Sequence, residues 1–300
     1  MVNIDIQGWL DKLGERFRPL GWGLRLYRRY SELHGNQMAS SITLTAFLTL
    51  FPLVLVGIAI LGFVSVNSGD VPDRITENLG LTGEAADIVE RAITTAEHSR
   101  RVASVIGILG LLVTGLGLAG ALAYAYNTAW QVSGRGIKDR LFQLGWLVGL
   151  GVLVAATFVA TTSLEVVGGR LGQIALLVLG IALNVALFLW TSTVLPNRRV
   201  GMKRLLPAAF VGGLALELLK VVGTLVVPRL VTNASELYGT LGVVFAILAW
   251  LLVLGRIVVF VAVLEVVGFE SKHGTRQVTL EVPAIPRREP KKITRGGGLG

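Results

Sequence analysis

Long apolar stretches separated by short polar segments make up most of the chain. A helix needs about 20 mostly apolar residues to cross the hydrocarbon core of a bilayer, and six stretches are long enough. They cover approximately residues 42–66, 102–126, 141–164, 174–195, 205–227 and 238–267. Helices that are apolar on all sides are typical of membrane spans. The pattern therefore predicts an all-α, polytopic membrane helix bundle with six transmembrane helices, whose membrane domain covers residues 35–268.

The segment before the first span, residues 1–34, alternates apolar and basic positions. Leucines and aromatic residues recur between Trp9 and Leu33, with Lys and Arg between them, and Pro19 divides the segment. This pattern predicts an amphipathic helix lying in the membrane interface. A helix packed beneath the bundle is the alternative.

Two further segments lie outside the predicted spans. Residues 68–101 are acidic and carry apolar positions at helical spacing on both sides of Gly80–Gly83, which predicts an outer helical hairpin. Its apolar faces either cap the bundle or lie passively on the surface. Residues 269–300 contain prolines, basic clusters and a Gly-rich end, so we expect a disordered basic tail.

The distribution of Lys and Arg predicts the orientation of the spans. Twenty of these residues fall in the N-terminal segment, the second-to-third loop, the fourth-to-fifth loop and the tail, against six in the opposite loops. Basic residues accumulate in cytoplasmic loops. An even number of spans places both termini on one side, so both termini are expected to be cytoplasmic.

Composition narrows the classes of function. The chain is 53% hydrophobic and 16% charged, with a net charge of +9 and no cysteine. The basic clusters follow the loops and carry no aromatic platform, so we expect anionic lipid headgroups at the cytoplasmic face rather than nucleic acid as partners. Metal-ligand spacings and the phosphate-binding GxxxxGK[ST] motif are absent from the sequence. We therefore expect no enzyme activity and no cofactor.

Two ionisable residues interrupt the fifth span. Glu217 and Lys220 are three residues apart, so they share a helix face and can pair. A charge at the centre of a membrane helix costs roughly 2.5–3.5 kcal/mol on insertion scales, and pairing reduces this cost only in part. We therefore expect both to face the protein interior or water, either as a candidate transport site or as a structural ion pair.

Other polar groups lie at similar depth. Arg256 of the sixth span either bonds helix carbonyls or reaches Glu217, and Glu265 is close enough to the cytoplasmic end to reach the interface. Asn184, Thr49 and Thr224 complete the candidate polar cavity, although Thr is also common as a structural residue between membrane helices. Gly145 and Gly149 form a GxxxG pattern, which predicts close helix packing.

Three stretches resemble the YihY/virulence factor BrkB family of bacterial inner-membrane proteins, in particular its YhjD-like branch. They are GNQMASSITLTAFLTLFPLVLV (35–56), LPNRRVGMKRLLPAAFVGGLALELLKVV (195–222) and YGTLGVVFAILAWLLVLGRIVVFVAVLEVV (238–267). The resemblance implies six spans, a location in the bacterial plasma (inner) membrane, and transport of an envelope lipid or a solute. The family was formerly labelled ribonuclease BN, a label that the missing metal ligands do not support.

Two functions are consistent with these features. The first is a transporter or exporter of a lipid-like or amphiphilic solute, acting through a polar cavity that contains Glu217 and Lys220. The alternative is a structural or scaffolding envelope protein that uses the outer hairpin and the basic tail to recruit partners. Homo-oligomerisation is left open by the sequence.

Overall fold

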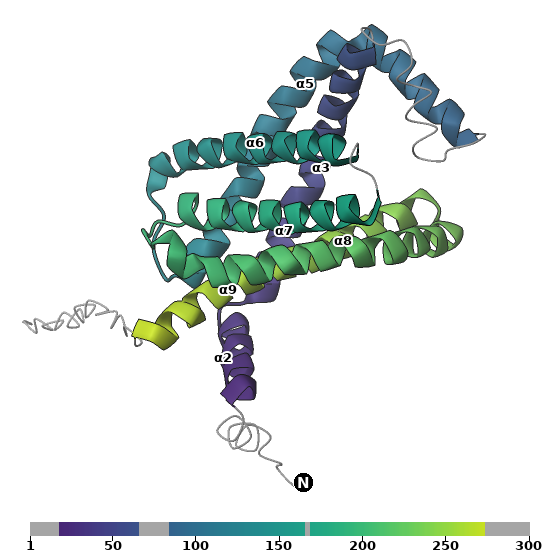
Figure 1. Cartoon of the computed structure of the whole chain (residues 1–300). Helices are drawn as coiled ribbons and strands as arrows, with labels where there is room; N and C mark the ends of the chain where they lie inside the picture. The colour runs from purple at the N-terminus through teal and green to yellow at the C-terminus, as the bar shows by residue number, and fades with distance from the viewer. Residues whose placement is uncertain (1–17, 66–83, 166–168, 274–300) are drawn as a thin grey trace, which may run out of the picture.

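The computed structural model describes residues 18–65, 84–165 and 169–273, and these residues form long helices (Figure 1). Helix α2 covers Arg18–Glu32 and α3 covers Gly35–Ser65. Helix α5 covers Glu84–Ala129, and a short 3-10 turn, η1 (Gly136–Lys138), precedes α6 at Asp139–Glu165. Helices α7 (Gly169–Val194), α8 (Met202–Tyr238) and α9 (Thr240–His273) complete the described chain.

Six of these helices, α3 and α5 to α9, are long and apolar enough to cross a membrane. Each of them coincides with one of the stretches predicted from hydropathy, so the predicted six-span helix bundle is confirmed. The length and apolar composition of each stretch are enough to predict a span, because each stretch is at least as long as the hydrocarbon core requires.

Helix α9 lies at the centre of the packing. It contacts α2, α3, α5 and α8, and nearly all of its residues from 258 to 267 are buried. In Figure 1, α6, α7 and α8 lie one above another, while α3 and α5 cross behind them. Helices α3, α5, α6 and α8 expose many apolar side chains, as expected of surfaces covered by lipid.

Helix α2 packs against the bundle through one face. Leu26 and Tyr30 are buried, whereas Tyr27, between them, is 67% exposed. The Tyr30 ring lies 6.1 Å from Phe260 of α9, and its hydroxyl donates a hydrogen bond to Asn36 at 3.1 Å. Of the two arrangements predicted for this segment, the structure therefore contains the packed helix over residues 18–32. Residues 1–17 lie outside the described residues.

The second arm of the predicted outer hairpin lies within the described residues, and it is helical. Residues 84–101 belong to the same helix as the second span, although the ribbon of α5 turns sharply near one end of the bundle (Figure 1). The sequence has neither glycine nor proline between residues 84 and 106, so nothing in it interrupts the helix. The first arm, within residues 68–83, lies outside the described residues.

Two helix ends also differ from the prediction. Helix α9 continues to His273, so residues 269–273 of the expected tail are helical, and residues 274–300 lie outside the described residues. Helix α8 continues past Pro228 to Tyr238. Gly239 alone then links α8 to α9, with a φ of +59° that glycine adopts at little cost.

Candidate functional site

The predicted ion pair in the fifth span is present and has a third member. Glu217 and Lys220 of α8 lie 2.5 Å apart. The side-chain amide of Asn184, in α7, donates a hydrogen bond of 2.9 Å to the same Glu217 oxygen. Glu217 is 14% exposed and Lys220 is 58% exposed. The carboxylate is therefore held between two helices, while the ammonium group points away from the chain.

A glycine on α7 makes this arrangement sterically possible. A Cβ atom added to Gly180 would lie 2.9 Å from one Glu217 carboxylate oxygen and 3.0 Å from the other. Gly180 precedes Asn184 by one helical turn, so both residues lie on the same face of α7. The α7 face thus supplies the space for the carboxylate and one hydrogen-bond donor to it.

Within the described chain, the remaining predicted site residues form no hydrogen bond or ion pair with this cluster. Thr49 donates to the carbonyl of Thr45 in its own helix at 2.7 Å, and Thr224 donates to the carbonyl of Val221 at 2.8 Å. Arg256 is exposed and lies close enough to Tyr30 to influence it electrostatically. Within the described ranges Arg256 forms no ion pair with Glu217. The structure therefore brings together Asn184, Glu217 and Lys220 only.

Glu265 was expected to reach the membrane interface, and that expectation is wrong. Its side chain is 3% exposed and accepts a short hydrogen bond from Ser192 of α7. Its second oxygen, Oε2, has no hydrogen-bond partner among the described residues. Tyr126 of α5, which is fully buried, lies close to the same carboxyl group. A second polar cluster is thus buried where α5, α7 and α9 meet.

Sequence reasoning missed this cluster because its members come from three separate helices. Ser192 and Glu265 are 73 positions apart. Glu265 is an isolated polar residue in an apolar stretch, whereas Ser192 lies between Thr191 and Thr193. The only available signal was the Glu itself, since an ionisable residue in a span usually faces the protein interior. Because Glu265 is near the end of the sixth span, the sequence favoured a side chain that reaches the membrane interface.

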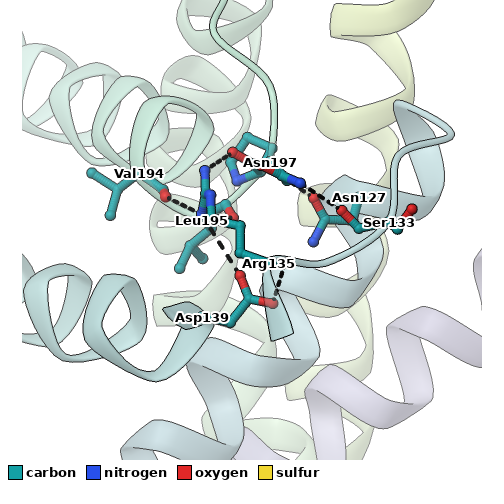
Figure 2. Close-up of polar contacts among 8 residues, drawn as sticks. Asn127, Ser133, Arg135, Asp139, Val194, Leu195 and Asn197 are labelled. Carbon is teal, nitrogen blue, oxygen red and sulfur yellow. Dashed lines mark hydrogen bonds and ion pairs between the residues drawn. The ribbon is translucent and has the colours of Figure 1, made fainter. Parts of the chain in front are cut away.

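Figure 2 shows polar contacts that join the loop after α5 to the loop after α7, and we call this set of contacts the clasp. The Arg135 guanidinium contacts the carbonyl oxygens of Val194, Leu195 and Pro196. Asp139 holds Arg135 by an ion pair of 3.7 Å and accepts a hydrogen bond from its backbone N–H. The last carbonyls of a helix lack partners within the helix, and a cation there also opposes the helix dipole. Arg135 therefore caps α7.

Asn197 completes the clasp. Its backbone N–H donates to the Asn127 side-chain oxygen at 2.7 Å, and its side-chain amide donates to the carbonyl of Ser133 at 2.9 Å (Figure 2). These bonds fix the segment after α7 against the end of α5. The next residue, Arg198, consequently lies over the ring of Trp130, with its guanidinium carbon 4.6 Å from the ring centroid.

A pocket of about 320 Å³ lies beside this clasp, between α2, the start of α8 and the end of α9. Glu265 forms part of its wall, and Phe269 contributes an aromatic side. Trp130 packs edge-on against Phe269, with the two ring centroids 5.6 Å apart. The clasp, the aromatic pair and the buried carboxyl group therefore form one continuous assembly.

These features define an integral, multi-pass, all-helical membrane protein with two polar clusters within its bundle. A model of the family "Virulence factor BrkB" matches residues 26–283, which is most of the chain. The chain therefore belongs to the BrkB family, as its sequence motifs indicated.

Similar proteins carry few functional descriptions. The chain is 25% identical over 266 residues to the inner membrane protein YhjD of Escherichia coli (strain K12), covering 80% of this chain and 78% of that protein. It is 25% identical over 284 residues to an uncharacterized protein of Dickeya dadantii (strain 3937), and the match covers 86% of this chain and 85% of that protein. A UPF0761 membrane protein of Chromohalobacter salexigens is 27% identical over 245 residues, and the match covers 75% of this chain and 57% of that protein. No solved structure matches the chain.

Proposed function

We propose that this protein is a transporter of the bacterial inner membrane that moves a lipid-like or amphiphilic solute past the Glu217–Lys220 pair. The observation that carries the proposal is the position of Lys220, whose side chain is 58% exposed within a spanning helix. Its neighbours Leu218 and Val221 are exposed apolar residues. An ammonium group on such a surface is costly beside acyl chains, and the anionic group of a passing solute would reduce this cost further than Glu217 alone does.

The same residues explain why an amphiphile suits this path. Glu217 and Lys220 offer both charges to a polar group, and the exposed apolar side chains around them accept a hydrocarbon part. We further propose that both termini are cytoplasmic, because the basic loops would then face the cytoplasm. The name of the YhjD relative as an inner membrane protein supports the inner membrane as the location.

We propose two kinds of partner and no chemical reaction. Anionic lipid headgroups would contact the basic residues of α2, where Arg25 and Arg28 are exposed. A second copy of the chain, in a homo-oligomer, is the other partner that we propose. The protein would act without a cofactor and would not cleave RNA.

Transport can be tested with the full chain reconstituted into vesicles. Phospholipids with a fluorescent label on one acyl chain, with phosphoethanolamine or phosphoglycerol headgroups, serve as probes, and dithionite reduces the label only on the outer leaflet. We expect the wild type to move labelled lipid between leaflets faster than protein-free vesicles. Glu217→Gln and Lys220→Met should each reduce the rate at least about tenfold, equivalent to 1.4 kcal/mol in the barrier.

The matched control is Thr193→Val. Thr193 lies in a spanning helix, and its hydrogen bonds within the described residues go to carbonyls of that helix, so its variant should retain the wild-type rate. The proposal is overturned if wild-type protein moves neither lipid faster than empty vesicles. It is also overturned if both charge variants are folded and retain the full rate.

A further inference from the structure

The pocket near Glu265 combines opposite charges in one small space. Lys203 and Arg204, at the start of α8, form its exposed cationic side. Glu265, from α9, forms part of its buried wall, and Trp22 and Phe269 supply aromatic surface. A ligand that fits both ends needs an anionic group for the cations and a hydrogen-bond donor for the carboxyl group.

The buried carboxyl group has unused binding capacity. Glu265 Oε1 is occupied by Ser192, whereas Oε2 is buried and has no hydrogen-bond partner among the described residues. A buried polar atom without a partner costs free energy, and no Lys or Arg of the described chain forms an ion pair with Glu265. Arg198 and Arg204 instead lie over Phe269, at 5.0 and 5.7 Å from its ring centroid. A donor brought by a ligand would satisfy the free oxygen.

The pocket is also continuous with the apolar outer surface of the bundle. Val211 lines the pocket and is 48% exposed on α8. Phe210 and Leu214, which follow α8 toward the middle of the membrane, are 52% and 48% exposed. A ligand with its polar part in the pocket can therefore lay a hydrocarbon chain along α8, which distinguishes a lipid from a water-soluble solute.

We infer that this pocket binds the headgroup of an aminophospholipid, with the phosphate at Lys203 and Arg204 and the primary amine at Glu265. Basic pockets between membrane helices bind lipid phosphates in this way. An ammonium group provides both N–H donors and a positive charge, which together compensate a buried carboxylate better than a hydroxyl group does. The inference deepens the proposed transport function and rests on it in one respect, since it names the lipid class that would be carried.

Native mass spectrometry of the full-length protein with three added phospholipids tests the inference directly. The lipids share their acyl chains and carry phosphoethanolamine, phosphocholine or phosphoglycerol headgroups. Phosphocholine retains the positive charge but has no N–H donor, and phosphoglycerol has hydroxyl groups instead of the amine. We expect the phosphoethanolamine lipid to bind about tenfold tighter than either of the others, as one charge-assisted hydrogen bond would produce.

Two variants separate the two ends of the pocket. Glu265→Gln should remove the preference for phosphoethanolamine and leave binding of the phosphoglycerol lipid unchanged. Lys203→Ala combined with Arg204→Ala should weaken binding of all three lipids about tenfold or more, through loss of charge-assisted contacts to phosphate. Both residues of the second variant are exposed, so this variant tests the site even where Glu265→Gln does not fold.

Arg199→Ala is the matched control, because Arg199 is an exposed cation of the same loop that does not line the pocket. It should bind all three lipids as the wild type does. Soluble phosphoethanolamine, added in excess, should fail to displace the lipid, and displacement at the lipid's own concentration would assign the pocket to a water-soluble ligand. Equal binding of the three lipids, or unchanged binding in the double variant, would overturn the inference.

Binding and transport fail separately in these measurements. Selective lipid binding without movement between leaflets would reject the proposed transport function and leave the headgroup site in place. Movement without any headgroup preference at the pocket would reject the site and leave transport in place.

Discussion

Gly180 of α7 and Glu217 of α8 face each other so closely that the missing side chain of one provides the space for the carboxylate of the other. A Cβ atom at position 180 would lie within 3.0 Å of both carboxylate oxygens. The opposing helix therefore determines where the Glu217 carboxylate lies, and Asn184 and Lys220 are placed to meet it there.

Gly180→Ala should disturb this cluster. The added methyl group forces the carboxylate away from Gly180, and the hydrogen bond from Asn184 is then lost. We expect the free energy of unfolding to fall by about 1 kcal/mol, the net value of one hydrogen bond. Thermal unfolding in detergent, followed by tryptophan fluorescence, measures the change.

A double variant isolates the cause of that loss. If Gly180→Ala acts by breaking the Asn184 hydrogen bond, then adding Asn184→Ala should cost little more than either change alone. Gly151→Ala serves as the control, since a Cβ atom there meets no other atom within 4 Å. Full additivity of the two losses would contradict this explanation.

The GxxxG pattern of α6 should respond at only one of its two glycines. A Cβ atom at Gly149 would overlap the indole ring of Trp190, whereas one at Gly145 would meet nothing within 4 Å. The indole is rigid and is held by a hydrogen bond to the carbonyl of Trp146. Gly149→Ala should therefore lower the free energy of unfolding by about 1–3 kcal/mol, as overpacking does, and Gly145→Ala should leave it unchanged or raise it. Equal unfolding midpoints for the two variants would contradict this prediction.

These glycines show what the sequence can and cannot predict. Six spans follow from hydropathy, because the bilayer sets a minimum length for each apolar stretch. The rotation of each helix about its own axis depends on its neighbours, and a helix that is apolar all round gives no signal for it. The sequence therefore predicted contact for Gly145 and Gly149 alike, and it paired Glu217 with Lys220 but not with Asn184 on the next helix.

Arg135 illustrates the same limit for a charged residue. Its position in a basic loop predicted only a contribution to the orientation of the spans. In the structure it contacts three carbonyl oxygens at the end of α7 and is held by Asp139. Leu195, one of the residues whose carbonyl it contacts, is 60 positions away in the sequence, so no local sequence pattern could reveal this contact.

Arg135→Ala should uncap α7 and loosen the clasp. We expect the free energy of unfolding to fall by about 2 kcal/mol, because several carbonyl groups lose a charged donor. Arg135→Lys should recover little of this, since a single ammonium group cannot span three carbonyls as the planar guanidinium does. Arg199→Ala, an exposed change in the neighbouring loop, should leave the unfolding midpoint unchanged. A midpoint for Arg135→Ala equal to that of the control would contradict the capping role.

Tyr30 should make the docking of α2 sensitive to alkaline pH. Burial raises the pKa of Tyr30 above its ordinary value, and the opposing effect of Arg256 is smaller. A raised pKa means that the folded state favours the neutral phenol. The stabilisation is then complete below the unfolded-state pKa of about 10 and is lost as the pH rises through the higher folded-state value. The unfolding midpoint should consequently fall more steeply above pH of about 10 in the wild type than in Tyr30→Phe.

The comparison with Tyr30→Phe isolates one phenol among the five tyrosines of the chain. Phe retains the ring that packs near Phe260 and loses only the hydroxyl group that donates to Asn36. Tyr27→Phe is the control, because Tyr27 is on the same helix and is 67% exposed, so its removal should leave the wild-type pH profile unchanged. If Tyr30→Phe and Tyr27→Phe give the same profile as the wild type, ionisation of Tyr30 does not contribute to the docking of α2, and the packing of its ring must account for the contact alone.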